Sequence, residues 1–347
     1  MTKNSKVSQD LPDTVANSVL VGYRSTGIGL FGVVMRFTGM PLEKIALFMN
    51  SSQVTGKNQF RKSIRLTFQD GFLTPYRVVG PSSITAWFLQ YSIMGFAFQF
   101  FDRALSKMVG VEPVCYGQDL MKPPNDTEAE RSAGYKVKYL GKTLLVPVLT
   151  GGLESWVSNR AEVQRYFGVD KFARIQSRIN ANPIIRSAGP AFLANTMRNI
   201  IMCNTTFVIT PMTYKRFFPQ EQKNRSSLFW YGLSMNIFLG NVVAITQQAL
   251  WGQSLDYYAQ HNGRIRYKEV IHEGLQRDGF KAFFTPAKWS SRVLMNAPAQ
   301  GVLPWFYHEI LPSGEDTILG AAKAVYCSPS QIHESLLTER SNHSRRK

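Results

Sequence analysis

Two long stretches of this sequence carry no charged residue. They are Ile84–Phe101 and Tyr231–Trp251, and each has about the length that an α-helix needs to cross a bilayer. Four further apolar stretches are shorter or contain a charge: Val19–Met40, Leu144–Val157, Ile200–Met212 and Val293–Phe306. Their Gly, Ser, Thr, Asn and Gln content suits helices that face one another or an aqueous cavity. We therefore predict an all-α membrane protein with six transmembrane helices; the alternative is a soluble protein with buried helices.

Composition narrows the class of protein further. The 347 residues include 40 Lys and Arg against 23 Asp and Glu, a net charge of +17, although only 18% of residues are charged. The apolar and aromatic content excludes a disordered chain, and three cysteines exclude a disulfide scaffold. A basic balance leaves nucleic acid or a membrane with basic loops. The polar residues 1–18 contain no apolar signal segment and no Arg-rich presequence, so we expect internal targeting information.

A short motif recurs in the sequence. Gln69–Phe72 reads QDGF and Arg277–Phe280 reads RDGF, 208 residues apart. Two steps of about half that distance predict a middle copy between residues 170 and 185, where Asn180–Ile184 stands. Each copy follows apolar residues at helical spacing. These are Phe60, Ile64 and Phe68 in the first copy, Phe172, Ile175 and Ile179 in the second, and the stretch Tyr267–Gln276 in the third. The sequence predicts three repeats of two spans and one short surface helix each.

The stretches between paired spans are basic. Residues 50–79 contain five basic residues against Asp70 alone, and residues 159–188 contain six against Glu162 and Asp170. Cation-rich loops mark the side of the membrane whose surface is anionic or whose potential is negative. A nucleic-acid patch would not recur in phase with membrane spans, so we expect no nucleic-acid partner.

These motifs carry a family resemblance. Pro41-Leu42-Glu43, Gly71–Thr74 and Phe96–Phe98 in the first repeat, with Lys281–Phe284 and Trp289-Ser290 in the third, are similar in order and spacing to the mitochondrial carrier family. The resemblance covers residues 17–312, and the first repeat looks most like the ADP/ATP carriers. It implies a monomeric six-helix barrel of the mitochondrial inner membrane, with both termini toward the intermembrane space and short helices in the matrix. It also implies the bilayer and cardiolipin as lipid partners.

The resemblance divides the chain into six segments. They are a polar segment (1–16), repeat one (17–110), an intermembrane-space linker (111–134), repeat two (135–222), repeat three (223–312) and a tail (313–347). The Pro-rich linker and the long tail exceed a minimal carrier. They are loose loops or a docking surface for a neighbouring protein.

The family's charged gates look degenerate in this sequence. The odd-helix signature needs Pro, an acid and a base in each repeat. Repeat one keeps Pro41 and Glu43 but has Ala46 at the basic place, and repeat two keeps Glu154. Two acids without basic partners cannot form a closed ring of ion pairs. In a shifted alignment, Arg160 would pair with one of the two acids, but not with both. On the even helices, the gate keeps only Arg103 and Lys215.

The family's substrate contacts lie midway along the even helices. By alignment these positions are Trp87, Asn199 with Ile200, and Met295, so the arginines of the ADP/ATP carriers are absent. Arg198 and Arg292 lie beside them. They form either a shifted site for an anion, which a guanidinium binds through a fixed fork of donors, or a structural ion pair.

The other motifs in the sequence do not indicate a cofactor, metal or catalytic site. Gly27–Gly32 spells GxGxxG, but it opens an apolar span without the strand of a dinucleotide fold, so helix packing is expected. No residues have metal-ligand or catalytic spacing, so we expect no metal, no cofactor and no enzyme. Cys115, Cys203 and Cys327 are expected as free thiols, with a Cys115–Cys327 disulfide as the alternative.

Two functions remain. The first is a structural or accessory subunit of a larger inner-membrane complex of the respiratory type, because both gates are broken and extra segments lie on one side. The second is a divergent solute carrier that exchanges an anionic metabolite or nucleotide.

Overall fold

The computed structural model describes residues 12–50, 54, 58–77, 81–123, 132–167, 172, 188–261, 265–296 and 302–326. All regular structure in these ranges is helical, so the prediction of an all-α protein is confirmed for the described part of the chain.

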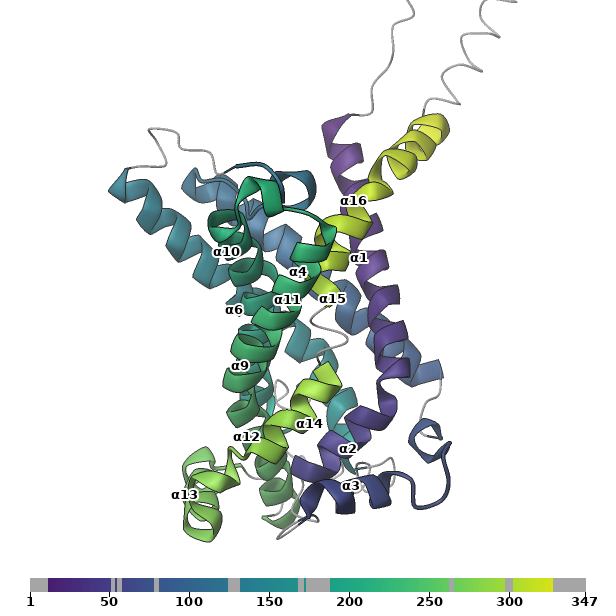
Figure 1. Cartoon of the computed structure of the whole chain (residues 1–347), viewed down its shortest axis with the longest axis vertical. Coiled ribbons are helices and arrows are strands. Elements are labelled where there is room, and N and C mark those ends of the chain that lie inside the picture. Colours follow the sequence, from purple (N-terminus) through teal and green to yellow (C-terminus); the bar gives the residue numbers. More distant parts are fainter. Residues whose placement is uncertain are drawn as a thin grey trace, which may run out of the picture.

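The elements fall into three successive units (Figure 1). The first contains α1 (Asp13–Thr38), α2 (Met40–Asn50), α3 (Gln59–Thr67), η1 (Thr74–Tyr76) and α4 (Pro81–Val109). After η2 (Gly117–Leu120), the second contains α6 (Ala133–Phe167), α9 (Phe192–Asn204), η3 (Thr205–Ile209) and α10 (Thr210–Phe217). The third contains η4 (Gln220–Gln222), α11 (Arg225–Met235), η5 (Asn236–Gly240), α12 (Asn241–Gln260), α13 (Tyr267–Asp278), η6 (Gly279–Ala282), α14 (Pro286–Asn296), α15 (Val302–Trp305), η8 (Phe306–Ile310) and α16 (Leu311–Ser313). A last helix covers residues 315–326.

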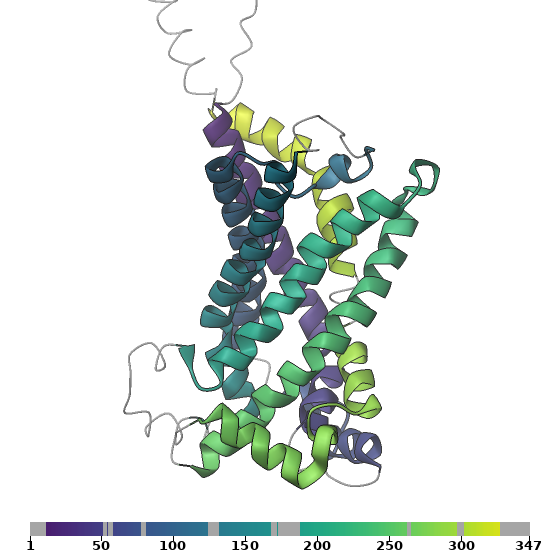
Figure 2. The same cartoon turned by 90° about the vertical axis from the view of Figure 1, so that its left-hand side faces the viewer.

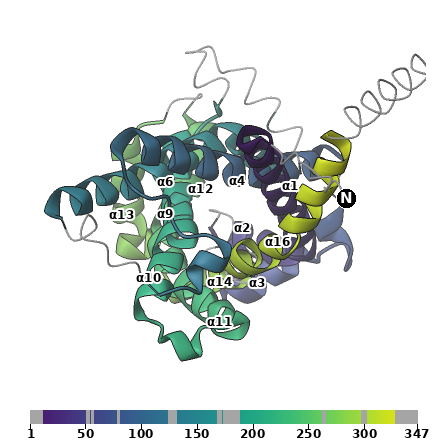
Figure 3. The ribbon, with the colours of Figure 1, turned by 90° about the horizontal axis from the view of Figure 1, so that it is seen from above.

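The long helices form a closed ring. Going round it, α1 packs against α4, α4 against α6, α6 against α9, α9 against α12, α12 against α14, and α14 against α2. Figure 3 looks along the axis of this ring, and Figure 2 shows the helices crossing it at a tilt. Both described chain ends lie at one end of the bundle, while α3 and α13 lie at the other (Figure 1). We call these the linker end and the short-helix end.

The repeated DGF motif places a glycine with positive φ after a short helix in both described copies. Gly279 is the C-cap of α13, whereas α3 already ends at Thr67 and Gly71 follows it by four residues; their φ values are 60° and 110°. Glycine adopts positive φ without the steric cost of a Cβ atom, so the motif turns the chain after each helix. The third-copy helix Tyr267–Gln276 is confirmed by α13. The predicted middle copy lies outside the described residues, except Phe172.

The outside of the bundle is largely apolar, while its interior holds many polar side chains beside an apolar core. Large apolar side chains point outward along the helices, among them Leu30, Leu144, Trp156, Trp230 and Phe238, each at least 40% exposed. The interior holds charged and amide side chains, among them Glu43, Lys142, Glu162, Arg198 and Arg292, each 7% exposed or less. Large exposed apolar surfaces mark contact with lipid or protein, and charges in membrane helices face the bundle interior.

Two helical stretches are long and apolar enough to cross a membrane, judged by length and composition. They are Asp13–Thr38 and Arg225–Gln260, which contain most of the predicted span Val19–Met40 and all of Tyr231–Trp251. The remaining predicted spans lie in or across α4, α6, α9–α10 and α14–α15. Their passage through a membrane stays a prediction.

Glycines set the closest helix contacts. In the GxGxxG stretch, a Cβ atom on Gly29 would lie 2.0 Å from Ser92 Oγ, and one on Gly32 would lie 2.2 Å from the Tyr91 ring. The prediction that these glycines serve helix packing is confirmed. The tightest backbone contact is at Gly151 of α6, where a Cβ atom would lie 2.6 Å from the backbone nitrogen of Ile200 in α9.

Two adjacent glycines provide a test of this packing. We expect Gly151→Ala to lower the free energy of unfolding by about 1–3 kcal/mol, because α6 must move away from a backbone that cannot yield. Gly152→Ala meets nothing within 4 Å, and we expect it to leave stability unchanged or raise it by up to about 1 kcal/mol through helix propensity. Thermal unfolding of both variants in detergent measures the difference. Equal stabilities would contradict the close approach of α6 and α9.

Candidate functional site

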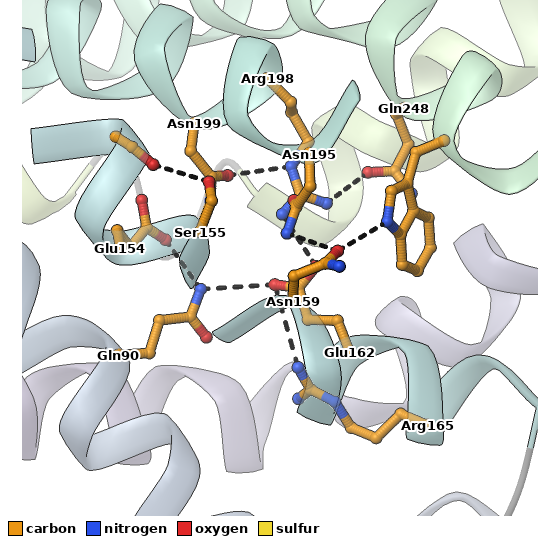
Figure 4. Close-up of polar contacts among 12 residues, drawn as sticks. Gln90, Glu154, Ser155, Asn159, Glu162, Arg165, Asn195, Arg198, Asn199 and Gln248 are labelled. Atoms are coloured by element: carbon orange, nitrogen blue, oxygen red, sulfur yellow. Dashed lines mark hydrogen bonds and ion pairs between the residues drawn. The ribbon is translucent and has the colours of Figure 1, made fainter. Parts of the chain in front are cut away.

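A network of buried charges crosses the interior near the short-helix end (Figure 4). Its centre is Glu162 of α6. The Arg198 guanidinium of α9 donates to Glu162 Oε2 at 2.9 Å. Arg36 of α1 and Arg165 of α6 lie 3.9 and 4.0 Å from Glu162 Oε1, and the Gln90 amide of α4 donates to that same oxygen at 3.4 Å. Four helical segments from two units therefore meet at one carboxylate.

The second carboxylate of the network is Glu43. Its oxygens lie 3.0 Å from Arg36 and 3.6 Å from Arg165. Arg36 is in the last turn of α1 and Glu43 in the first turn of α2, on either side of the break at Gly39. Pro41 cannot donate to the preceding turn, so it suits this break in the helix. The break brings the two charged side chains together.

Amide side chains extend the network toward the third unit. Arg198 also donates to Gln248 Oε1 of α12 at 2.7 Å and to Asn199 Oδ1 at 3.0 Å. The Asn159 side-chain oxygen accepts from Trp251 Nε1 and from the Asn195 amide, both at 3.0 Å. These bonds join α6, α9 and α12, so the three units are connected through buried polar groups.

The space inside the network is small. The cavity between these side chains has a volume of about 20 Å³, and it is lined by Arg36, Glu43, Ala46, Leu47, Glu162, Arg165, Arg198, Gln248, Trp251, Arg292 and Met295. A single water needs about 10–15 Å³. The network therefore leaves room for about one water and none for a metabolite.

The sequence-based view of this gate needs correction. The expectation that the signature acids have no basic partner is wrong for Glu43. Arg36 and Arg165 form ion pairs with it, although both lie outside the aligned signature positions. Arg160 is exposed and plays no part. Glu154 accepts from Gln90 at 2.8 Å and lies 3.9 Å from the Cys203 thiol, not beside a base.

The central acid Glu162 was missed by sequence reasoning. It lies outside the aligned signature and was counted among the charges of a basic loop. The i, i+3 spacing of Glu162 and Arg165 on an extended α6 would have indicated them, since α6 runs to Phe167 and carries both.

The predicted substrate contacts converge on this network. Arg198, Arg292 and Met295 line the same cavity, and Asn199 is bonded to Arg198. Trp87 is 1% exposed, and the Arg165 guanidinium lies 5.6 Å from its ring centre. Arg198 is neutralised by Glu162. Arg292 makes no ion pair with a carboxylate in the described residues and lies 3.9 Å from Met295 Sδ.

A second closure lies at the linker end, where the chain after α4 enters the ring. Lys142 Nζ of α6 lies 2.7 Å from Asp102 Oδ1 of α4 and donates to the Glu112 carbonyl at 2.8 Å. Asp102 Oδ2 accepts from the Val114 backbone N–H at 2.9 Å. This ion pair thus fixes the start of the linker against the ends of α4 and α6.

Tyr116 connects the linker to both ends of the described chain. Arg24 of α1 and the Tyr116 hydroxyl both donate to Glu315, at 2.7 Å, and the Arg24 guanidinium stacks 3.9 Å from the Tyr116 ring centre. Glu315 follows α16, so these contacts join the first helix, the linker and the start of the last helix.

Aromatic rings fill the interior below the linker. Phe98 of α4 stacks on Phe207 of η3 at 4.8 Å, Phe207 contacts Tyr307 of η8 at 5.3 Å, and Tyr307 contacts Tyr116 at 4.8 Å. Edge-to-face and offset pairs at these distances are favourable. The rings come from an even helix of each unit and from the linker, so they close the ring from the side opposite the charge network.

The even-helix gate residues lie at this end. Arg103 donates to Asn17 Oδ1 at 3.1 Å, and Lys215 lines a cavity beside the linker. Neither residue forms an ion pair with a carboxylate among the described residues.

The cysteines do not form a described site. Burial raises the pKa of the Cys115 thiol, which keeps it protonated at neutral pH, and Cys203 is a buried free thiol. Cys327 lies outside the described residues, so its pairing with Cys115 stays a prediction.

Comparison with known proteins gave no identification: no family model matches the chain, and no curated protein matches it.

The network predicts that replacing one buried carboxylate by an uncharged amide strongly lowers the stability of the protein. We expect Glu162→Gln to destabilise the protein by about 3–5 kcal/mol, because removing one partner of a buried ion pair leaves arginines uncompensated. Glu221→Gln, at an exposed position in η4, is the matched control with no expected effect. Thermal unfolding in detergent measures both variants.

A double-mutant cycle checks that the effect belongs to the pair. Combining Glu162→Gln with Arg198→Gln should cost less than the sum of the two single losses, because the two groups interact directly. Additive losses would contradict a direct interaction between them.

Proposed function

We propose that this chain is a carrier-like protein of the mitochondrial inner membrane that serves as a structural subunit of a larger membrane complex. The main observation behind this proposal is that buried side chains fill the axis of the bundle near the short-helix end. Glu43 and Glu162 occupy the positions around Arg36 and Arg198 that a substrate anion would need, and they leave about 20 Å³.

The polarity of the bundle supports a membrane location. Apolar side chains cover its outside, and ion pairs lie inside. In a bilayer this arrangement is favourable, because lipid cannot satisfy charged groups and the bundle interior can. The two stretches that qualify as spans by composition belong to the first and third units, and their neighbours complete the ring.

The short helices support the proposed sidedness. Phe60 and Ile64 on α3 are 40% and 36% exposed, and Ile271 and Leu275 on α13 are 39% and 45% exposed. Both helices lie at the same end of the bundle (Figure 1). Amphipathic helices with basic residues bind at an anionic membrane surface, which is the matrix side in the proposed orientation and would be rich in cardiolipin.

Closure at both ends supports a static role. A transporter must open each end in turn, which breaks every contact of one closure per cycle. Here one closure includes the charge network of three units, and the other includes a linker clamped by Lys142, Arg24 and Glu315. Opening either end would break these ion pairs and their hydrogen bonds together.

A divergent solute carrier is the second candidate. The observation that favours it is Arg292, which is buried beside the network without a carboxylate partner in the described part of the chain. An anion that replaced Glu162 as the partner of Arg198 would find Arg292 beside it.

Native electrophoresis of mildly solubilised mitochondria tests the structural role. We expect the chain to migrate with an assembly many times its mass of 39.2 kDa, and mass spectrometry of that band identifies its neighbours. A related inner-membrane protein known to be monomeric serves as the migration control. Migration of this chain as a lone monomer would exclude the subunit role.

Uptake by proteoliposomes separates the two candidates. We expect no saturable uptake of phosphate, ADP or a dicarboxylate, because both ends are closed by the chain's own side chains. Arg292→Gln is the informative variant, because it removes the one arginine of this network without a carboxylate partner in the described residues. Saturable exchange that Arg292→Gln abolishes would favour the carrier, provided that the variant keeps the thermal stability of the parent.

A further inference from the structure

A large cavity lies at the linker end, separate from the charge network. Its volume is about 920 Å³, within the upper part of the range of small-molecule sites, about 300–1,000 Å³. Its walls come from α1, α4, the linker, α6, η3, α10 and η8. The linker thus forms part of a chamber that the ring alone would leave open.

The walls carry an excess of positive charge. Four of the charged groups there are held in three ion pairs: Asp102 with Lys142, Asp119 with Lys122, and Arg24 with Glu315. Four cations have no carboxylate partner in the described residues, and they are Arg103, Lys136, Lys215 and Arg216. Against them stands the single side-chain carboxylate of Glu112.

An unsatisfied buried side chain faces the same chamber. His308 of η8 is 2% exposed, lines the cavity, and has no hydrogen-bond partner on either ring nitrogen. A buried polar group without a partner costs about 1–3 kcal/mol. Two such atoms beside a cation-rich cavity indicate a place for a hydrogen-bonding ligand.

The floor of the chamber is closed and aromatic. Phe98, Phe207 and Tyr307 line the cavity; Phe98 stacks on Phe207, and Tyr307 meets Phe207 edge-to-face. Tyr116 and Tyr139 add further aromatic surface. A molecule in the chamber therefore meets cations and rings but no onward passage, so it is held there and does not cross the bundle.

We propose that this chamber is a binding site for a phosphate-bearing organic anion, held between the linker and helices α4, α6 and α10. A phosphate group carries about −1.5 to −2 charges at neutral pH and three acceptor oxygens, which matches the excess of cations. The apolar part of the molecule packs on the rings, and His308 donates to it or accepts from it. The anion comes from solution or is a lipid headgroup.

Two probes distinguish these sources. Sodium phosphate represents the free anion, and dihexanoyl phosphatidic acid represents the lipid. Each is titrated by calorimetry into the full chain in detergent, and thermal unfolding is followed in parallel. Binding of phosphate that phosphatidic acid displaces supports a free-anion site. Binding of phosphatidic acid alone supports a lipid site. Dihexanoyl phosphatidylcholine, which has no net charge, is the reference probe.

A charge-matched pair of variants tests the position of the site. We expect Lys215→Gln with Arg216→Gln to weaken binding by about tenfold or more, because two charge-assisted contacts are lost. Arg61→Gln with Arg65→Gln removes the same charge from the exposed face of α3 at the short-helix end and should leave binding unchanged. His308→Phe should also weaken binding, and it serves as a second variant if the first misfolds.

Three results would overturn the proposal. One is binding of neither phosphate nor phosphatidic acid. Another is equal binding of phosphatidic acid and phosphatidylcholine, which would indicate acyl chains alone. The third is an equal loss of binding in the α3 variant, which would indicate attraction by overall charge. None of these outcomes depends on the migration of the chain in native electrophoresis, so the site and the structural role can fail separately.

Discussion

The Glu162 carboxylate is the interaction on which the closed bundle depends. Arg36 of α1 and Arg198 of α9 converge on it from other helices, Arg165 reaches it from the next turn of α6, and Glu43 shares Arg36 and Arg165. Leaving a buried charge without its partner is strongly destabilising. Because each arginine would lose a partner if its helix moved away, the network holds α1, α2, α6 and α9 at fixed positions. The amide bonds of Arg198 and Asn159 extend this constraint to α12.

The two ends of the bundle are closed by different kinds of interaction. At the short-helix end, ion pairs fill the axis and leave space for about one water. At the linker end, stacked rings fill the axis, and a loop is held across it by Lys142 and Glu315. The cation-rich chamber lies at the linker end, where the chain's own linker forms part of its wall. Closure at both ends by the chain's own side chains is the basis of the proposed structural role.

Parts of the site could be read from the sequence, and parts could not. Glu43 and Pro41 stand in a recognisable motif, and Arg198, Arg292 and Met295 were placed near one axis by alignment. The alignment did not identify the basic partners of Glu43, because Arg36 precedes the motif and Arg165 lies eight residues after the aligned span. Glu154, which the motif points to, binds Gln90 instead. A signature gives the residue at a position on one helix, but the helix bend and tilt decide which side chains meet.

The sequence by itself determined that the chain is helical, that uncharged runs alternate with basic stretches, and that a glycine turns the chain after the short helix at each of the two DGF motifs. These features follow from local rules: apolar periodicity, helix propensity and the freedom of glycine at positive φ. Only the tertiary structure decided which charges neutralise one another, how little space remains between them, and that the linker covers a cation-rich chamber. The physical reason is that ion pairing and cavity volume depend on side chains that lie up to 291 residues apart in the chain, as Arg24 and Glu315 do, and no local pattern encodes their separation in space.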